Sequence, residues 1–205
     1  MTSLRPEAVW TVAALLAVVA IAVPATRERL EREAAGGADL TIEVRASQWR
    51  WEYTYLDEMG GRRFGFASVG ATPDEAVAGL VRKDDTYLRA VDRPLVIPAQ
   101  RKVRLLVTSD DVVHAFWVPD LGIRADAVPG VLRTVWLIPN APGTYRGQCA
   151  AFCGEGHGFM PAVVEVRSAE AFDDWQRDTA ATLVARAAGG ARAGAGSGAG
   201  PGADA

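Results

Sequence analysis

Gln148-Cys-Ala-Ala-Phe-Cys-Gly-Glu-Gly-His-Gly-Phe-Met160 is the segment around which this chain is organised. It contains both cysteines of the 205-residue chain, Cys149 and Cys153, one of its two histidines, His157, and one of its three methionines, Met160. Thiolate and thioether sulfurs, together with neutral imidazoles, are ligands that copper prefers over magnesium, calcium or manganese. The segment therefore predicts a metal-binding loop with soft donors.

The other histidine, His114, lies upstream in Ser109-Asp-Asp-Val-Val-His-Ala-Phe-Trp-Val-Pro119. One loop that offers Cys, Cys, His and Met, joined by a distant histidine from a second loop, is typical of a copper site assembled across a β-sandwich. We therefore expect the two segments to meet in the fold.

Three simpler interpretations compete with copper and stay open on the residues alone. The cysteines could pair as a disulfide if the domain is exported, although this leaves the histidines and the methionine unexplained. Zinc motifs usually pair their cysteines with a second close Cys/His pair, whereas here the second histidine is single. Inert core thiols are common, but a loop with three alternate glycines packs poorly into a core. The residues favour copper.

The composition bounds the class of protein without identifying its function. A hydrophobic fraction of 49% is ample for a core, and 23% charged residues is ordinary. The net charge of −3 gives no signal of nucleic-acid binding. The length suits one domain with appendages.

The two metal-ligand segments resemble the dinuclear copper (CuA) domain of subunit II of haem–copper oxidases, the subunit that receives electrons from cytochrome c. Three further stretches carry the resemblance: Gln48–Tyr53, Leu121–Gly130 and Pro142–Gln148. The match covers roughly residues 40–167, with the segments in the same order. The resemblance implies a mainly β, cupredoxin-like Greek-key β-sandwich with the metal loops at one end.

The resemblance also implies the ligands of two copper ions. The two cysteine thiolates bridge the ions, each histidine binds one ion, and a thioether and a backbone carbonyl are weak axial ligands. The expected ligands are His114, Cys149, Ala151, Cys153, His157 and Met160.

Ala151 departs from the family pattern. The family usually has glutamate there, and that side chain joins a magnesium site shared with the catalytic subunit. A backbone carbonyl survives the change to alanine, so we expect copper binding without the shared magnesium ligand.

Trp49 aligns with the family tryptophan that lies above the copper and takes the electron from cytochrome c. Cytochrome c is usually lysine-rich around its haem edge, so acidic residues near this tryptophan would steer it. The candidate docking residues are Asp57, Glu58, Asp110 and Asp111.

Short strands are expected through most of the domain. Thr41–Ser47 alternates apolar and polar residues, and Gln48–Tyr55 places four aromatic side chains on one face. Residues 57–85 form an irregular excursion with a short hairpin. Further strands are expected at Tyr87–Val91, Leu95–Ile97, Val103–Thr108, Leu132–Ile138, Gly143–Gln148 and Ala162–Val166. Strands without long helices between them predict an all-β sandwich.

Ala8–Val23 is an apolar run that ends at Pro24, with arginines on both sides. Its length is just within the range of a membrane-spanning helix. A signal peptide cleaved near Val23–Ala25 is the alternative, and the flanking charges do not decide the orientation. From the resemblance we expect one uncleaved transmembrane helix in the bacterial inner membrane, with the copper domain on the periplasmic side. Most family members carry two such helices.

The C-terminal region predicts one amphipathic helix. Phe172, Trp175, Thr179 and Leu183 recur at helical spacing, and Ser168 is a candidate N-cap. The expected parts of the chain are an anchor with a charged linker (1–38), the copper domain (39–167), the C-terminal helix (168–188) and a disordered Gly/Ala-rich tail (189–205).

The resemblance implies a subunit of a terminal respiratory oxidase. It would pass electrons from cytochrome c through CuA to the haem of subunit I, where oxygen is reduced. The expected partners are subunit I, other oxidase subunits, cytochrome c and the membrane, but no nucleic acid. The alternatives are the CuA subunit of a nitric oxide reductase-like complex and a copper-carrying cupredoxin.

Overall fold

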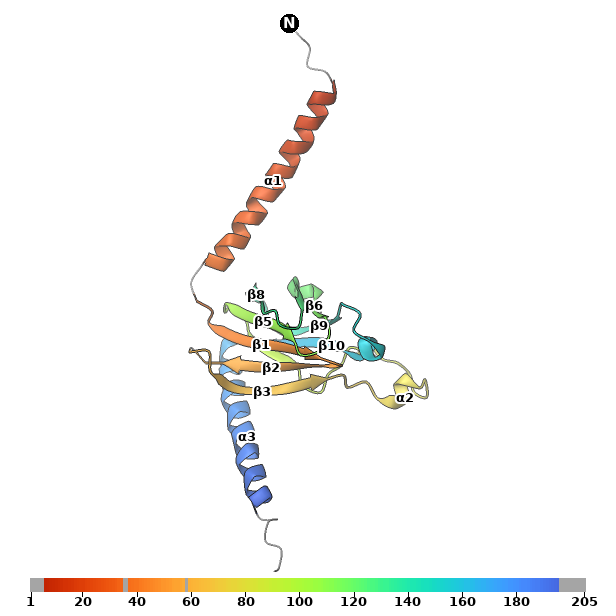
Figure 1. Ribbon diagram of the computed structural model, residues 1–205, viewed down its shortest axis with the longest axis vertical. Helices are drawn as coiled ribbons and strands as arrows, with labels where there is room; N and C mark the ends of the chain where they lie inside the picture. Colours follow the sequence, from red (N-terminus) through yellow and green to blue (C-terminus); the bar gives the residue numbers. More distant parts are fainter. Residues whose placement is uncertain (1–5, 35–36, 58, 196–205) are drawn as a thin grey trace, which may run out of the picture. The chain divides into compact units, whose positions relative to one another are not determined.

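The computed structural model describes residues 6–34, 37–57 and 59–195, in an N-terminal unit that ends at Gly37 and a β-rich unit that begins at Ala38 (Figure 1). The helices are α1 (Pro6–Ala34), α2 (Asp74–Val77) and α3 (Ala169–Ala195), with short 3-10 helices η1 (Pro119–Leu121) and η2 (Glu155–Phe159). The strands are β1 (Leu40–Ser47), β2 (Arg50–Leu56), β3 (Arg62–Val69), β4 (Leu95–Pro98), β5 (Val103–Ser109), β6 (His114–Val118), β7 (Ile123–Ala127), β8 (Arg133–Leu137), β9 (Gly143–Cys149) and β10 (Pro161–Arg167).

The N-terminal helix α1 continues through Pro24, where the apolar run was expected to end. Proline removes one helical hydrogen bond, but the Arg, Glu, Leu and Ala residues that follow it are strong helix formers. The stretch Pro6–Arg27 has a mean hydropathy of 2.4 over its best window, and none of that window is buried. This stretch is long and apolar enough to cross a membrane.

The β-rich unit is a sandwich of two five-stranded sheets. One sheet has the order β3-β2-β1-β5-β8 and the other has the order β4-β10-β9-β6-β7. Most neighbouring strands are antiparallel, while β1 pairs with β5 and β4 with β10 in parallel. Apolar side chains of both sheets meet between them and form one buried cluster. The predicted cupredoxin-like β-sandwich is confirmed.

Strand register brings three loops together at one end of the sandwich. Ala46 pairs with Ser109, so the β1–β2 turn lies beside the β5–β6 loop. In the other sheet, Phe116 near the start of β6 pairs with Cys149 at the end of β9. The β9–β10 loop therefore begins next to the point where the β5–β6 loop ends.

The aromatic residues of β2 fill the core, with one exception. Trp51, Tyr53 and Tyr55 are fully buried, and the Tyr55 hydroxyl donates to the Val96 carbonyl oxygen of the opposite sheet. Trp49 was expected to begin this strand, but it lies in the turn before β2 and is half-buried. The chain reverses at Gln48 and Trp49, so these two side chains face the end of the sandwich where the three loops meet.

The excursion after β2 contains the predicted hairpin, since β3 pairs with β2 along its whole length. The strand predicted at Tyr87–Val91 is wrong. This segment is a turn followed by a single bridge from Val91 to Gly70. The segment is rich in apolar residues, as a short buried strand would be, but only Val91 pairs with another segment in a β-bridge, at Gly70.

The C-terminal helix α3 begins as predicted, because the Ser168 hydroxyl accepts a hydrogen bond from the Ala171 N–H at 3.3 Å. Arg101 anchors the helix through two parallel bonds of 2.8 Å to the Asp173 carboxylate. The helix continues to Ala195, so residues 189–195 are not the expected disordered tail. Ala191, Ala193 and Ala195 favour this continuation, although Gly189, Gly190 and Gly194 lower the helix propensity of the stretch. Residues 196–205 lie outside the described residues.

We expect Gly147→Ala to destabilise the domain by about 2–3 kcal/mol. A Cβ at this position would lie 1.8 Å from the Trp117 carbonyl oxygen, and the β6–β9 pairing holds both backbones. Chemical unfolding of the two proteins measures the difference. Gly158→Ala is the control, because nothing lies within 4 Å of the Cβ it would add. Equal unfolding midpoints for both variants would contradict this close backbone contact.

Candidate metal centre

The first pair of donor atoms lies where β6 begins and β9 ends. His114 Nδ1 lies 3.9 Å from Cys149 Sγ, and both side chains are buried. The pairing of Phe116 with Cys149 determines this proximity, because it leaves His114 at the same end of the sheet.

The β9–β10 loop supplies the second pair. Cys153 Sγ lies 3.8 Å from Cys149 Sγ on one side and 3.5 Å from His157 Nδ1 on the other. The short helix η2 turns the chain back so that His157 faces Cys153, and the His157 N–H donates to the Gly154 carbonyl oxygen at 3.1 Å. The order of donors is therefore imidazole, sulfur, sulfur, imidazole.

The two weaker ligands expected from the sequence flank Cys149. Cys149 Sγ lies 3.3 Å from the Ala151 carbonyl oxygen, close enough for the thiol to donate to it. The Met160 side chain is buried, and its carbonyl oxygen accepts the Cys149 N–H at 2.9 Å. The structure thus brings donor atoms of His114, Ala151 and His157 within 3.9 Å of one of the two cysteine sulfurs. It also places the backbone of Met160 against Cys149.

Both cysteines are free thiols. Their sulfurs are separated by 3.8 Å, whereas a disulfide bond is about 2.05 Å long. Burial, and then the neighbouring Cys149 sulfur, raise the pKa of Cys153 to about 12. Because metals bind thiolates, a metal ion that enters this site must displace the Cys153 proton.

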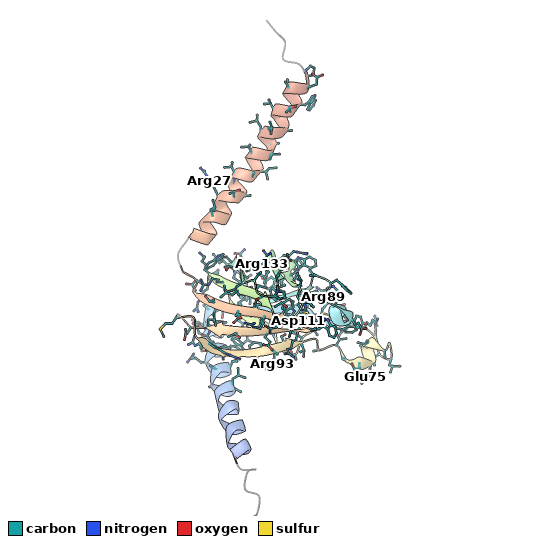
Figure 2. The ribbon with its side chains drawn as sticks, viewed as in Figure 1. Arg27, Glu75, Arg89, Arg93, Asp111 and Arg133 are labelled. Atoms are coloured by element: carbon teal, nitrogen blue, oxygen red, sulfur yellow. The ribbon has the colours of Figure 1, made fainter. Side chains whose placement is uncertain are left out.

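Asp111, labelled on the β-sandwich in Figure 2, contacts the His114 ring at Nε2, while Nδ1 of the same ring faces Cys149. Its Oδ1 lies 2.9 Å from His114 Nε2, and its Oδ2 accepts the Gln48 N–H at 2.7 Å. Partial burial would raise the pKa of Asp111, but hydrogen bonds from His114, Val112 and Gln48 outweigh it and lower the pKa to about 2. The ionised carboxylate therefore orients the ring so that Nδ1 faces Cys149.

Two side chains of the β1–β2 turn hold the metal loop at one oxygen atom. Gln48 Nε2 and Trp49 Nε1 both donate to the Cys153 carbonyl oxygen, at 2.9 and 3.1 Å. The indole of Trp49 covers Gly156, where a Cβ would lie 2.3 Å from the ring. Trp49 thus contacts the backbone of the metal loop directly.

The three expected docking residues that the structure describes do not lie together. Asp57 follows β2 at the end opposite Trp49, about 23 Å away for a seven-residue strand, and it accepts backbone N–H groups in its own turn. Glu58 lies outside the described residues. Asp110 forms an ion pair with Arg45. Of the three candidates that the structure describes, Asp110 and Asp111 lie at the metal end of the sandwich.

Sequence reasoning missed two residues of this site. Gln48 was noted only as part of an aromatic segment, although it bonds Cys153. Phe152 is 84% exposed at the tip of the loop, with its ring 5.8 Å from that of His157. The position of Phe152 between Cys149 and Cys153 could have indicated, from the sequence alone, that it belongs to the site.

The donor set fits a soft metal. The donor atoms of His114, Cys149 and Cys153 lie within 4.8 Å of one another, all three side chains are buried, and His157 adjoins them. Sulfur and imidazole donors suit copper or zinc, and hard cations prefer oxygen. A buried methionine beside the cysteines favours copper, because thioether ligands are typical of copper sites.

Comparison with known proteins identifies similar chains. The family model described as Cytochrome C oxidase subunit II, periplasmic domain, matches residues 40–167. Probable cytochrome c oxidase subunit 2 of Rickettsia bellii is 41% identical over 169 residues, which are 82% of this chain and 60% of that protein. The corresponding protein of Rickettsia felis is also 41% identical, over 82% of this chain and 51% of its own length. The chain therefore spans about half to three fifths of the length of these relatives.

Solved structures agree with this similarity. The periplasmic domain of subunit II of cytochrome oxidase (CoxB) of Bradyrhizobium japonicum is 34% identical, with a TM-score of 0.61, and the match covers 72% of this chain and 97% of that domain. A mixed-disulfide intermediate between a thioredoxin-like protein and subunit II of cytochrome c oxidase is also 34% identical, with a TM-score of 0.55 over 71% of this chain and 92% of that one.

We expect Asp111→Asn to weaken copper binding about 10- to 100-fold, the usual loss when the hydrogen-bond partner of a metal-ligating histidine is removed. The neutral amide orients His114 less firmly and no longer supplies negative charge beside its ring. Competition titration against a chelator of known affinity measures the change. Asp110→Asn is the matched control, since Asp110 pairs with Arg45 instead. Equal affinities for the two variants would show that Asp111 does not support His114.

Proposed function

The chain belongs to the family of the periplasmic domain of cytochrome c oxidase subunit II, and on this premise we propose that it accepts electrons for a terminal respiratory oxidase. In this proposal, electrons pass from cytochrome c through a dinuclear copper (CuA) centre to the haem of the catalytic subunit, which reduces oxygen. The chain is then the electron-transfer part of an enzyme whose chemistry occurs in its partner.

The arrangement of the four strong donors carries the proposal. Two sulfurs lie side by side, and each has its own imidazole on the outer side, at 3.9 Å for Cys149 and 3.5 Å for Cys153. A single metal ion would need all four donors gathered around one point. Here the donors form a row with one imidazole beside each sulfur, and this arrangement suits two soft ions better than one. When bound, the copper pair supplies a one-electron carrier.

The surrounding residues limit rearrangement of these ligands. Asp111 orients His114, while Gln48 and Trp49 hold the Cys153 carbonyl oxygen. Burial of Cys149 and Cys153 excludes water from the sulfurs. Rigid, dry ligands favour rapid electron transfer, because little protein or solvent has to reorganise when the charge changes.

Trp49 is the proposed residue that takes the electron from cytochrome c. Its indole is half-buried and touches the metal loop at Gly156 and at the Cys153 carbonyl oxygen. This contact offers a short path from the surface to a ligand backbone. Asp110 and Asp111 are the proposed docking acids of this end, while Asp57 would serve only a donor that reaches the opposite end of β2.

Ala151 supports copper without magnesium. Its carbonyl oxygen lies 3.3 Å from Cys149 Sγ, so it could bind a copper ion held by that sulfur. Its methyl side chain offers no carboxylate to a shared magnesium ion. The same departure favours a second candidate, a CuA subunit of a nitric oxide reductase-like complex, because the partner subunit need not match the usual oxidase here.

The remaining proposals concern location, partners and maturation. We propose that α1 is the single-pass anchor of the chain in a bacterial inner membrane, that the β-sandwich is periplasmic, and that subunit I and other oxidase subunits are its partners. The mixed disulfide of the related subunit II with a thioredoxin-like protein supports a further step. Cys149 and Cys153 would then need reduction by such a protein before they bind copper.

Copper content and electron paramagnetic resonance of the full-length chain test the proposal. We expect two copper ions per chain that share one delocalised spin. Cys153→Ser, which leaves one thiolate, should bind a single copper with a localised spin. One localised copper in the unaltered chain would instead indicate a copper-carrying cupredoxin and refute the dinuclear centre.

Trp49→Phe should slow electron transfer from reduced cytochrome c to the copper-loaded chain about tenfold, the loss typical of an aromatic anchor at an interface. Copper content should not change, because Trp49 supplies no ligand atom and Gln48 still donates to the Cys153 carbonyl oxygen. Stopped-flow absorbance measures the rate. Trp117→Phe is the control, since Trp117 is also a partly exposed tryptophan but lies on β6 and supplies no candidate ligand atom. Equal rates in both variants would remove Trp49 from the pathway.

A further inference from the structure

We propose that the domain has a second binding site, for a small apolar carboxylate, in the cavity beneath α3. The cavity has a volume of about 300 Å³, at the lower end of the range for small-molecule sites. It lies where α3 crosses the seam of the sandwich, because β3 and β4 are edge strands of different sheets and both contact α3. No ligand of the proposed copper site lines it.

The floor of the cavity is apolar. Phe66 of β3 and Trp175 of α3 meet edge to face, with ring centroids 6.4 Å apart. Val96 and Leu183 line the same cavity. Aromatic and aliphatic surfaces of this kind bind the apolar part of a ligand by removing it from water.

Two guanidinium groups lie against these rings. Arg93 Cζ lies 5.5 Å from the centroid of Phe66, and Arg167 Cζ lies 5.8 Å from that of Trp175. A guanidinium over a ring face is held in place without using its hydrogen-bond donors. The two arginines therefore stand over the apolar floor as preorganised donors.

Each arginine uses only Nε for an ion pair. Arg93 Nε lies 3.5 Å from Asp92, and Arg167 Nε bonds Glu165 at 2.8 Å. In the part of the chain that the structure describes, the terminal nitrogens of both arginines make no hydrogen bond within the protein. Two terminal N–H groups form the fork that binds a carboxylate with two parallel bonds. The cavity thus offers an apolar floor and unused carboxylate-binding donors.

Acidic residues distinguish this site from a general anion site. The Glu165 carboxylate is neutralised by Arg167. Asp178 also lines the cavity, is exposed, and forms no ion pair with any described residue. Its charge opposes a bound anion weakly, because water screens it. A monoanion with a large apolar part suits this balance better than a phosphate, which would gain little from the apolar floor and be repelled more by Asp178.

Isothermal titration calorimetry of the full-length chain in a nonionic detergent tests the site with two probes, 2-naphthoate and decanoate. We expect saturable one-to-one binding of at least one probe, and the tighter probe shows whether the natural apolar part is aromatic or aliphatic. Arg93→Gln and Arg167→Gln should each weaken binding about tenfold or more, because a charged hydrogen-bonded pair is lost. The absence of saturable heat above a detergent blank for both probes would overturn the proposal.

Three controls make the test specific. Asp178→Asn should tighten binding about two- to threefold, since it removes a screened repulsion. Arg63→Gln should have no effect, because Arg63 of β3 bonds Gln176 of α3 but does not line the cavity. The neutral alcohol 2-naphthylmethanol should bind much more weakly than 2-naphthoate. Equal binding of the alcohol, or an equal loss in Arg63→Gln, would refute a carboxylate site. Copper is not needed for any of these measurements, so the outcome is independent of the proposed electron-transfer function.

Discussion

The pairing of β6 with β9 is the interaction on which the metal centre depends. It places His114, at the start of one strand, beside Cys149, at the end of the other, although 34 residues separate them in the sequence. The backbones of these strands approach so closely at Gly147 and Trp117 that a side chain at Gly147 would not fit. Strand pairing is dense in hydrogen bonds and buried apolar surface, so it fixes the relative positions of His114 and Cys149.

Loops from both sheets then complete the site through shared hydrogen bonds. Asp111 bonds His114 and the backbone of Gln48, and Gln48 with Trp49 bonds the Cys153 carbonyl oxygen. The network therefore links one histidine ligand to one cysteine ligand through the β1–β2 turn. The surface at Trp49 is thereby connected through hydrogen bonds to the candidate ligands His114 and Cys153, which supports the proposed electron exchange with a partner there.

The helix α3 has a different part in the fold. Phe172 and Trp175 cover the seam of the two sheets, and Arg101 fixes the start of the helix to the β4–β5 turn. The same packing leaves a cavity with two stacked arginines, Arg93 just before β4 and Arg167 at the end of β10. The domain thus has two separate regions. The candidate metal centre lies in the loops at one end of the sandwich, and the proposed carboxylate site lies beneath α3.

The sequence by itself determined the donor set, most strands and the family, because soft ligands and strand periodicity are local signals that need no partner to be read. It also indicated α3, but not its continuation over residues 189–195, and it suggested a strand at Tyr87–Val91 that has no neighbour to pair with. Tertiary structure alone decided which atoms meet: that Asp111 supports His114, that Gln48 and Trp49 share one carbonyl oxygen, and that Asp57 lies far from them. Register between distant strands sets these contacts, and register depends on the packing of the whole sandwich.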